Sequence, residues 1–325
     1  MRKLFALSAA VTMCVSLGWS GSLNPPAAPQ STPGPETRTP ISATTTPGNE
    51  VASYRITQRG SYHLTSNLVL NPLFPSRHGI VIEANDVTID LNGFILDGHQ
   101  PILPFSEGQA QGEVTQTVGI LASGSIENVT ILNGTVRDWD FQGIGLLNTT
   151  RSRIHNVRVL NSGNAGIVGG LRCVITDCVS EGNGNDGIRL RGESRVENCE
   201  VTDNAFVGIA VNGGGSRVVR NSVLGNQGDG IQVLLLGDRS LIAENLVTGG
   251  SSNGIYVLGS VAGAVVRDNV VGGNQGIGIV ESGTPPNGSL FYGNISSGNG
   301  TDYSNVPLVV TSPTESTGPF ANISE

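Results

Sequence analysis

The chain has 325 residues, only 14% of them charged, and a formal net charge of −8 at pH 7. An acidic protein of this kind does not attract nucleic acid or an anionic membrane by bulk charge, so we expect neither as a partner. It also repels polyanionic sugars unless a metal ion or a local cluster of arginines intervenes.

The N-terminus predicts export. Arg2 and Lys3 precede an apolar run from Leu4 to Trp19 that is too short for a membrane span, so we expect residues 1–22 to be a signal peptide. Its removal would take the net charge from −8 to −10. Residues 23–50 are rich in Pro, Thr, Ser and Ala without an apolar pattern, which predicts a disordered spacer. We expect a protein that is secreted or held in the cell envelope.

A Gly-Ile dipeptide returns along the chain at regular spacing. From Gly143 onward, the intervals between copies are 23, 21, 21, 22, 24 and 22 residues, a period typical of stacked repeats. Alternating stretches such as Ile188–Leu190 predict short strands, and the Gly, Asn, Asp and Ser between them predict turns. The copies begin at Gly79, Gly119, Gly143, Gly166, Gly187, Gly208, Gly230, Gly254 and Gly276.

About 22 residues make three short strands and three turns, which is one coil of a parallel β-helix whose coils lie ~4.8 Å apart. We therefore predict an all-β solenoid of nine to ten coils over residues 51–305. Its open ends expose unpaired strand edges, so 51–78 and the tail 306–325 are expected to cap them. A loop at 97–117 interrupts the period and stretches one interval to 40 residues.

A second series of residues, mostly asparagines, lies between the Gly-Ile copies and predicts a structural ladder at the second turn. Each side-chain amide would bond to the next coil in an otherwise dry place. The expected members are Asn128, Asn156, Asn198, Asn221, Asn245, Asn269 and Asn294. Cys178 and Cys199 share one register in neighbouring coils, which suits either a disulfide or two stacked thiols. No histidine joins them at a ligand spacing, so we expect no metal there.

The order Gly-Ile-x-Val, aliphatic strand, Asn, third strand resembles the right-handed parallel β-helix repeat proteins of the pectate-lyase-like superfamily. It is most similar to the short-repeat type grouped as carbohydrate-binding and sugar-hydrolysis β-helices. Gly60–Thr65 and Asn85–Gly93 resemble the first coil of many secreted bacterial members. The resemblance spans about residues 52–305 and implies a single-stranded right-handed helix, a fold that serves many functions.

In that superfamily the binding cleft follows the strand that here reads Gly-Ile-x-Val. Its outward positions hold Arg189, Gln232 and Tyr256, and Arg191 takes the next outward position. We expect these residues to form a shallow groove for a polysaccharide or cell-surface glycan, with Tyr256 as a stacking platform. We expect the protein to be a monomer. The alternative is that they are ordinary surface residues.

Two sets of acidic residues are candidates for catalysis. Asp186 and Asp229 lie two coils apart, ~9–10 Å, close to the ~6.5–9.5 Å between the carboxyls of inverting glycosidases. The inserted loop supplies the other set. Its titratable residues are Asp97, His99, Glu107 and Glu113. The alternative is that these acidic residues have no catalytic role and are ordinary turn and loop residues.

The catalytic signatures of the resembled superfamily are absent from the chain. It contains no Gly-His-Gly or Arg-Ile-Lys of the polygalacturonase type, no Asp-Pro-His of the alginate-epimerase type and no stacked acids for the calcium of the lyases. We therefore expect no cofactor, with calcium as an alternative that no motif in the sequence supports. Three functions remain open: a polysaccharide-engaging protein, a polysaccharide-degrading hydrolase or lyase, and a structural or adhesion rod of the cell envelope.

Overall fold

The computed structural model describes most of the chain from residue 38 onward. The described ranges are 38–69, 77–98, 116–234, 239–258, 263–282, 288–306, 309–310 and 322–324. The chain separates into two units, Met1–Glu36 and Thr37–Glu325, and the fold concerns the second. The expected signal peptide, the first part of the spacer, and His99, Glu107 and Glu113 of the inserted loop lie outside the described residues.

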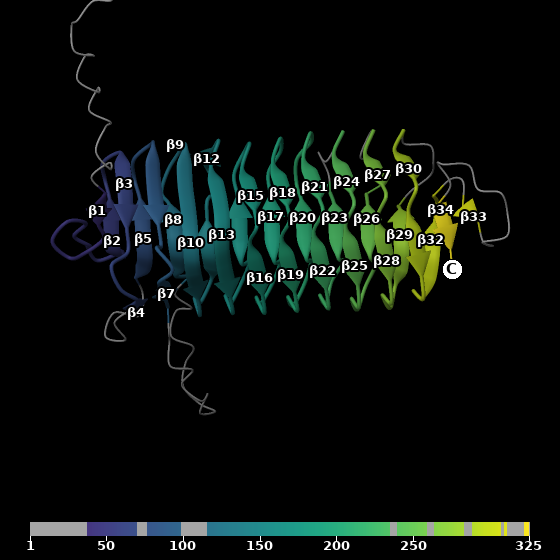
Figure 1. Ribbon diagram of the computed structural model, residues 1–325, viewed down its shortest axis with the longest axis horizontal. Helices are drawn as coiled ribbons and strands as arrows, with labels where there is room; N and C mark the ends of the chain where they lie inside the picture. The colour runs from purple at the N-terminus through teal and green to yellow at the C-terminus, as the bar shows by residue number, and fades with distance from the viewer. Residues whose placement is uncertain are drawn as a thin grey trace, which may run out of the picture. The chain divides into compact units, whose positions relative to one another are not determined.

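The described residues contain strands and no helix, and the strands wind into a parallel β-helix (Figure 1). One coil consists of β17 (Ile188–Leu190), β18 (Arg195–Glu197) and β19 (Glu200–Thr202). Each strand pairs in parallel with its counterpart in the next coil. The predicted solenoid with three strands in each coil is therefore confirmed.

The strands form two long sheets and one short one. The sheet named here the Gly-Ile sheet has 11 strands and takes one from each coil. Its members are β2 (Ala52–Ile56), β5 (His78–Ile82), β8 (Val118–Ala122), β11 (Gln142–Gly145), β14 (Ile167–Gly169), β17, β20 (Ile209–Val211), β23 (Ile231–Val233), β26 (Ile255–Val257), β29 (Ile277–Glu281) and β32 (Thr301–Ser304).

The large sheet takes two strands from each coil, and a two-residue turn separates them. β10 and β13 are exceptions, because each runs through this turn as one continuous strand. Its members are β1 (Thr39–Pro40), β3 (Gly60–His63), β4 (Leu68–Val69), β6 (Val87–Asp90), β7 (Ile95–Asp97), β10 (Val129–Arg137), β13 (Arg153–Leu160), β15 (Val174–Thr176), β16 (Val179–Glu181), β18, β19, β21 (Arg217–Val219), β22 (Ser222–Leu224), β24 (Leu241–Ala243), β25 (Leu246–Thr248), β27 (Val265–Arg267), β28 (Val270–Gly272), β30 (Leu290–Tyr292), β31 (Ile295–Ser297), β33 (Val309–Val310) and β34 (Asn322–Ser324). The short sheet joins β9 (Ile126–Glu127) to β12 (Thr149–Thr150).

The core is built from the inward residues of every strand. Alternation along each strand sends one residue inward, and coil stacking aligns these residues in columns. The isoleucine column of the Gly-Ile sheet is fully buried and comprises Ile80, Ile120, Ile144, Ile167, Ile188, Ile209, Ile231, Ile255 and Ile279.

The glycine before each of these isoleucines is required for space. At Gly187, an added Cβ would lie 2.4 Å from Val201 Cγ1 and 2.6 Å from Asn204 Nδ2. Both atoms belong to residues that follow in the same winding of the chain, so no side chain larger than hydrogen fits beneath them. The Gly-Ile repeat therefore records close packing at the corner that precedes the Gly-Ile sheet.

The last copy of the repeat was assigned the wrong register. The sequence spacing placed Gly276-Ile277 in the column, but the structure pairs Ile255 with Ile279. Gly278 is the residue whose carbonyl lies against Gly254, where an added Cβ would approach it to 2.6 Å. Because Gly276-Ile277 is followed directly by Gly278-Ile279, the dipeptide occurs twice and only the second copy meets the packing requirement.

A buried asparagine ladder runs along the corner between the two strands that each coil gives to the large sheet. In each step, the backbone N–H and the Nδ2 of one asparagine both donate to the Oδ1 of the next. Between Asn245 and Asn269 these distances are 3.0 and 2.9 Å. The members of the asparagine ladder are Asn221, Asn245, Asn269, Asn294 and Asn322.

Three residues expected in this ladder lie outside it. Asn156 and Asn198 lie on the outside of this corner with φ angles of 53° and 55°. Asn128, with a φ of 57°, lies at the corner after the Gly-Ile sheet, since its strand register places it beside Asp86. Asparagine tolerates this left-handed conformation, which explains its presence there. In later coils the row of Asn156 and Asn198 continues with Arg220, Glu244 and Asp268. The sequence series thus combined exposed residues from two different corners with the buried row that runs from Asn221 onward.

Two further buried ladders were not foreseen. At the corner after the third strand, Asn183 donates to Asn204, which donates to Asn226, through both the backbone N–H and Nδ2. At the corner after the Gly-Ile sheet, the N–H of Ser194 donates to the Oγ of Ser216. Each corner of the coil therefore has its own polar column, which satisfies backbone groups that the turns leave unpaired.

The N-terminal boundary of the helix lies earlier than expected. Residues 38–50 were assigned to the spacer, yet β1 pairs with β3 and Ile41 is only 2% exposed. The Ser, Thr and Pro composition predicted disorder, but one core residue and a tight turn order this segment. In the turn, the N–H of Thr46 donates to the carbonyl of Ser42. The expected C-terminal tail contributes β34, whose Asn322 extends the asparagine ladder.

We expect Asn245→Ala to lower the free energy of unfolding by about 2–4 kcal/mol, because it leaves the N–H of Asn221 and one of its two Nδ2 protons buried without an acceptor. Urea denaturation followed by circular dichroism measures the loss. Asn212→Ala is the matched control, since Asn212 is half-buried and makes no side-chain hydrogen bond within the described chain. Equal stability of the two variants would contradict the structural role of the ladder.

Candidate functional site

The outer face of the Gly-Ile sheet brings the predicted binding residues together. Arg189, Gln232 and Tyr256 lie in one outward row, with Ala210 between the first two. All three large side chains are half-buried, whereas Ala210 is 2% exposed. Arg191 is exposed and its Nη1 donates to the carbonyl of Leu147 at 3.4 Å, which lies two coils nearer the N-terminus.

Asp186 lies directly before this face and is buried. Its Oδ2 is 2.7 Å from both Nε and Nη2 of Arg189. Its Oδ1 has no hydrogen-bond partner among the described residues. Burial raises the pKa of Asp186 above 3.8, and the attraction and hydrogen bond of Arg189 oppose this shift, with a smaller contribution from the Val207 backbone. The site therefore holds a desolvated carboxyl with one unengaged oxygen.

Asp229 occupies the same position two coils later, but its carboxylate is fully engaged. Oδ1 accepts hydrogen bonds from Ser252 Oγ at 2.7 Å and from the N–H and Nδ2 of Asn253 at 3.1 and 2.9 Å. Oδ2 accepts one from Gln232 Nε2 at 3.0 Å. These four bonds fix the carboxylate as part of the turn, so its environment differs sharply from that of Asp186.

The two acids share a local arrangement. In each Asp-Gly-Ile-x segment, the side chain at x turns back to the aspartate, as Arg189 does to Asp186 and Gln232 to Asp229. The strands that follow them, β17 and β23, both pair with β20, so one coil lies between the acids. Val207 is the residue of that coil at their position, and the acids therefore do not touch one another.

An aromatic residue beside Asp186 was missed by the sequence analysis. Phe206 is 52% exposed, and its N–H donates to the carbonyl of Asn185 at 3.2 Å. The corresponding turn positions in neighbouring coils are Asn185 and Gly228. The sequence signal for this exposed aromatic residue was a large apolar side chain in a row of small or polar turn residues. Phe206 adds an exposed aromatic side chain to the turn that precedes the Gly-Ile sheet.

Asp97 does not fit the catalytic role considered for the inserted loop. It ends β7, is 5% exposed, and its Oδ2 accepts hydrogen bonds from Nε and Nη2 of Arg137 at 3.0 and 2.6 Å. An acid held in a strand by a bidentate ion pair acts as a structural group.

The cysteines are buried free thiols in the structure. The side-chain hydrogen bond with Cys178 and then burial raise the pKa of Cys199. The structure describes the pair as stacked free thiols, one of the two alternatives considered, and the disulfide stays a prediction. Both cysteines precede the asparagine ladder in the same column, since the N–H of Cys199 donates to Asn221 Oδ1 at 2.9 Å.

No group of three or more His, Cys, Asp or Glu residues in the described ranges has an arrangement that could hold a metal ion. Within the same ranges, no helix has the length and hydropathy of a membrane span.

We expect the carboxyl of Asp186 to titrate above 3.8, because burial disfavours its charged form. A pKa raised in the folded state stabilises the protein at low pH, and this contribution is lost as the pH rises through the folded pKa. Arg189→Met should raise the pKa further by removing the main opposing charge. Carboxyl-detected NMR titration of both proteins tests this, and a wild-type midpoint at or below 3.8 would contradict it.

Comparisons with known proteins agree on the fold. No curated protein is significantly similar to the chain in sequence. The A-module of mannuronan C-5 epimerase AlgE6 from Azotobacter vinelandii matches with a TM-score of 0.54 and 14% identity, over 84% of this chain and 88% of that one. A variant of the periplasmic alginate epimerase AlgG gives a TM-score of 0.51 and 14% identity, over 87% and 79%.

At 14% sequence identity, these two structural matches show a shared fold alone. The family model described as the right handed beta helix region matches residues 55–223 and 173–305, which together cover more than half of the sequence. The chain therefore belongs to the right-handed β-helix family.

Proposed function

We propose that the protein is exported and engages extracellular polysaccharide along the outer face of the Gly-Ile sheet. The observation that carries the proposal is the in-register row of Arg189, Gln232 and Tyr256, with Arg191 beside it. Strand pairing sets these side chains at multiples of ~4.8 Å along the helix axis. Such a row offers hydrogen-bond donors and an aromatic ring at fixed intervals to an extended chain molecule.

The aromatic residues supply the apolar part of this face. Tyr256 is half-buried in the row, and Phe206 projects from the turn that precedes it. Sugar rings present both apolar C–H faces and hydroxyl edges, so aromatic side chains next to polar groups suit them. The arginines add donors, although the Asp186 carboxylate already engages Arg189. Arg191 has no carboxylate partner among the described residues, which leaves its charge available to a ligand.

The structural neighbours support a polysaccharide as the ligand class. Both are named as enzymes that act on polysaccharides, mannuronan for AlgE6 and alginate for AlgG, and AlgG is described as periplasmic. The expected signal peptide of residues 1–22 agrees with export. We do not extend epimerase activity to this chain, because its sequence lacks the Asp-Pro-His expected of that type.

Tyr256→Ala is expected to weaken binding to a recognised polysaccharide about three- to tenfold, because it removes an aromatic contact. A glycan array identifies the ligand, and titration calorimetry measures the affinity. Tyr292→Ala on the large sheet is the matched control and should bind as the wild type. Unchanged affinity of Tyr256→Ala would remove the proposed face. Absence of any bound glycan would favour the structural rod.

A second candidate function is polysaccharide cleavage, and the environment of Asp186 favours it. A buried carboxyl with a raised pKa and an unengaged oxygen is suited to donate a proton as a general acid. Asp229 lies in the same row, although its four hydrogen bonds make it a positioned group.

Asp186→Asn should reduce any cleavage activity about 100-fold or more, because the amide cannot donate the proton in the same way. The assay measures new reducing ends or unsaturated products across a panel of polysaccharides. Asp203→Asn is the control, because Asp203 is exposed in the turn between β19 and β20. Full activity in Asp186→Asn would exclude this residue as the acid, and absence of product from the wild type would exclude cleavage of the panel.

A further inference from the structure

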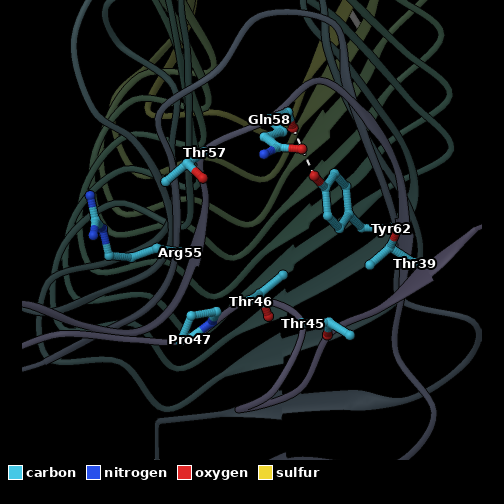
Figure 2. A pocket seen from close by; sticks show the side chains of 8 residues that line it. All are labelled: Thr39, Thr45, Thr46, Pro47, Arg55, Thr57, Gln58 and Tyr62. Carbon is cyan, nitrogen blue, oxygen red and sulfur yellow. Dashed lines mark hydrogen bonds between the residues drawn. The ribbon is translucent and has the colours of Figure 1, made fainter.

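A cavity of about 310 Å³ lies at the N-terminal end of the β-helix, between the turn 42–47 and the connection from β2 to β3. In Figure 2, Thr57 and Gln58 lie on one side of it and Thr45, Thr46 and Pro47 on the other. None of the residues that line it belongs to the row on the Gly-Ile sheet proposed above to bind polysaccharide.

The cavity arises because, among the described residues, no strand pairs with the outer edge of the first strand of the Gly-Ile sheet. β2 begins the sheet, and the preceding segment covers only part of its free edge. The N–H of Arg55 donates to the carbonyl of Thr46, and Pro47 forms an isolated bridge with Tyr54. Beyond Arg55, no backbone hydrogen bond joins the described parts of the two segments, which leaves the space beside Thr57 open.

The lining is polar and electrically balanced. Five of the eight lining side chains carry a hydroxyl group, one carries an amide, and none carries a carboxylate. The only cation is Arg55, whose Nε and Nη2 donate to the two carboxylate oxygens of Glu83 at 3.1 and 2.5 Å. A bidentate pair compensates the charge of the guanidinium. The cavity therefore offers neither a free cation for a phosphate nor an acid for an amine.

Some of the lining groups are already engaged and others are free. The hydroxyl of Tyr62 donates to the carbonyl of Gln58 at 2.8 Å, and the hydroxyl of Thr46 donates to Ser42. By contrast, the side chains of Thr39, Thr57 and Gln58 make no hydrogen bond within the described chain. These three side chains can together donate and accept, which is what a ligand rich in hydroxyl groups requires.

We propose that this N-terminal cavity binds a single uncharged sugar unit. Its volume lies at the lower end of the ~300–1,000 Å³ typical of ligand pockets. The rings of Tyr62 and Pro47 provide apolar walls, and the free groups of Thr39, Thr57 and Gln58 provide the polar contacts. A neutral polyol is the ligand class whose recognition needs hydroxyl and amide partners and no compensating charge.

The test uses the full chain and simple probes. Methyl glycosides of glucose, mannose and galactose are titrated at millimolar concentrations, with the methyl glycoside of glucuronic acid as the anionic comparison. Saturation-transfer NMR detects binding to the wild type. The double variant Thr57→Val, Gln58→Ala is expected to bind the preferred neutral glycoside about tenfold more weakly, because it lacks two hydrogen-bonding groups.

Gln227→Ala is the matched control, since Gln227 is an exposed turn residue many coils away, and it should bind as the wild type. Thermal unfolding verifies that the double variant is folded. Loss of methyl glycoside binding in Tyr256→Ala or Arg191→Ala would assign the bound sugar to the proposed polysaccharide face and overturn this proposal. The proposal is overturned if no neutral glycoside binds, if only the glucuronide binds, or if the double variant binds as the wild type.

Discussion

Hydrogen bonding along the helix axis is the constraint on which the rest of this structure depends. Each coil turns three corners inside a dry interior, and the backbone groups at a corner have no strand partner of their own. Side chains of the next coil supply the partners: asparagines at two corners and serines at the third. Because one carboxamide oxygen accepts two hydrogen bonds, a single residue type repeated in register satisfies a whole column. The corners then hold the strands flat on one another.

This regular interior leaves the outward positions free to vary, and variation marks the candidate site. Most coils carry an uncharged residue directly before the Gly-Ile sheet, whereas Asp186 and Asp229 place carboxylates there. Identical backbone positions give these two acids different chemistry because the following coil differs. Ser252 and Asn253 supply donors to Asp229, while Phe206 and Val207 leave one oxygen of Asp186 unengaged. The neighbouring coil thus decides how each acid behaves.

Much of the fold was predictable from the sequence, because a Gly-Ile spacing of 21–24 residues reports directly on packing at one corner. Register within a row was harder. Asn198 and Asn221 look equivalent in the sequence, yet one needs a left-handed backbone and the other a buried acceptor. Ile41 was hidden in a polar segment, and the doubled Gly-Ile at 276–279 gave no local sign of its true register. The site residues could be placed on one face from periodicity, but the hydrogen bonds to Asp229 and the N-terminal cavity depend on contacts between residues distant in sequence.

The asparagine ladder has a direction. Each backbone N–H and one Nδ2 proton donate toward the C-terminus, and each oxygen accepts from the coil before. The second Nδ2 proton donates the other way, to a carbonyl of the preceding coil. Loss of a coil from the C-terminal end would strip the acceptor from two buried donors, whereas loss of a coil from the other end would strip it from one Nδ2 proton and leave an oxygen with vacant lone pairs, which proteins tolerate better. The array is therefore intolerant of shortening from one end and more forgiving at the other, an asymmetry that a purely apolar stack of coils would lack.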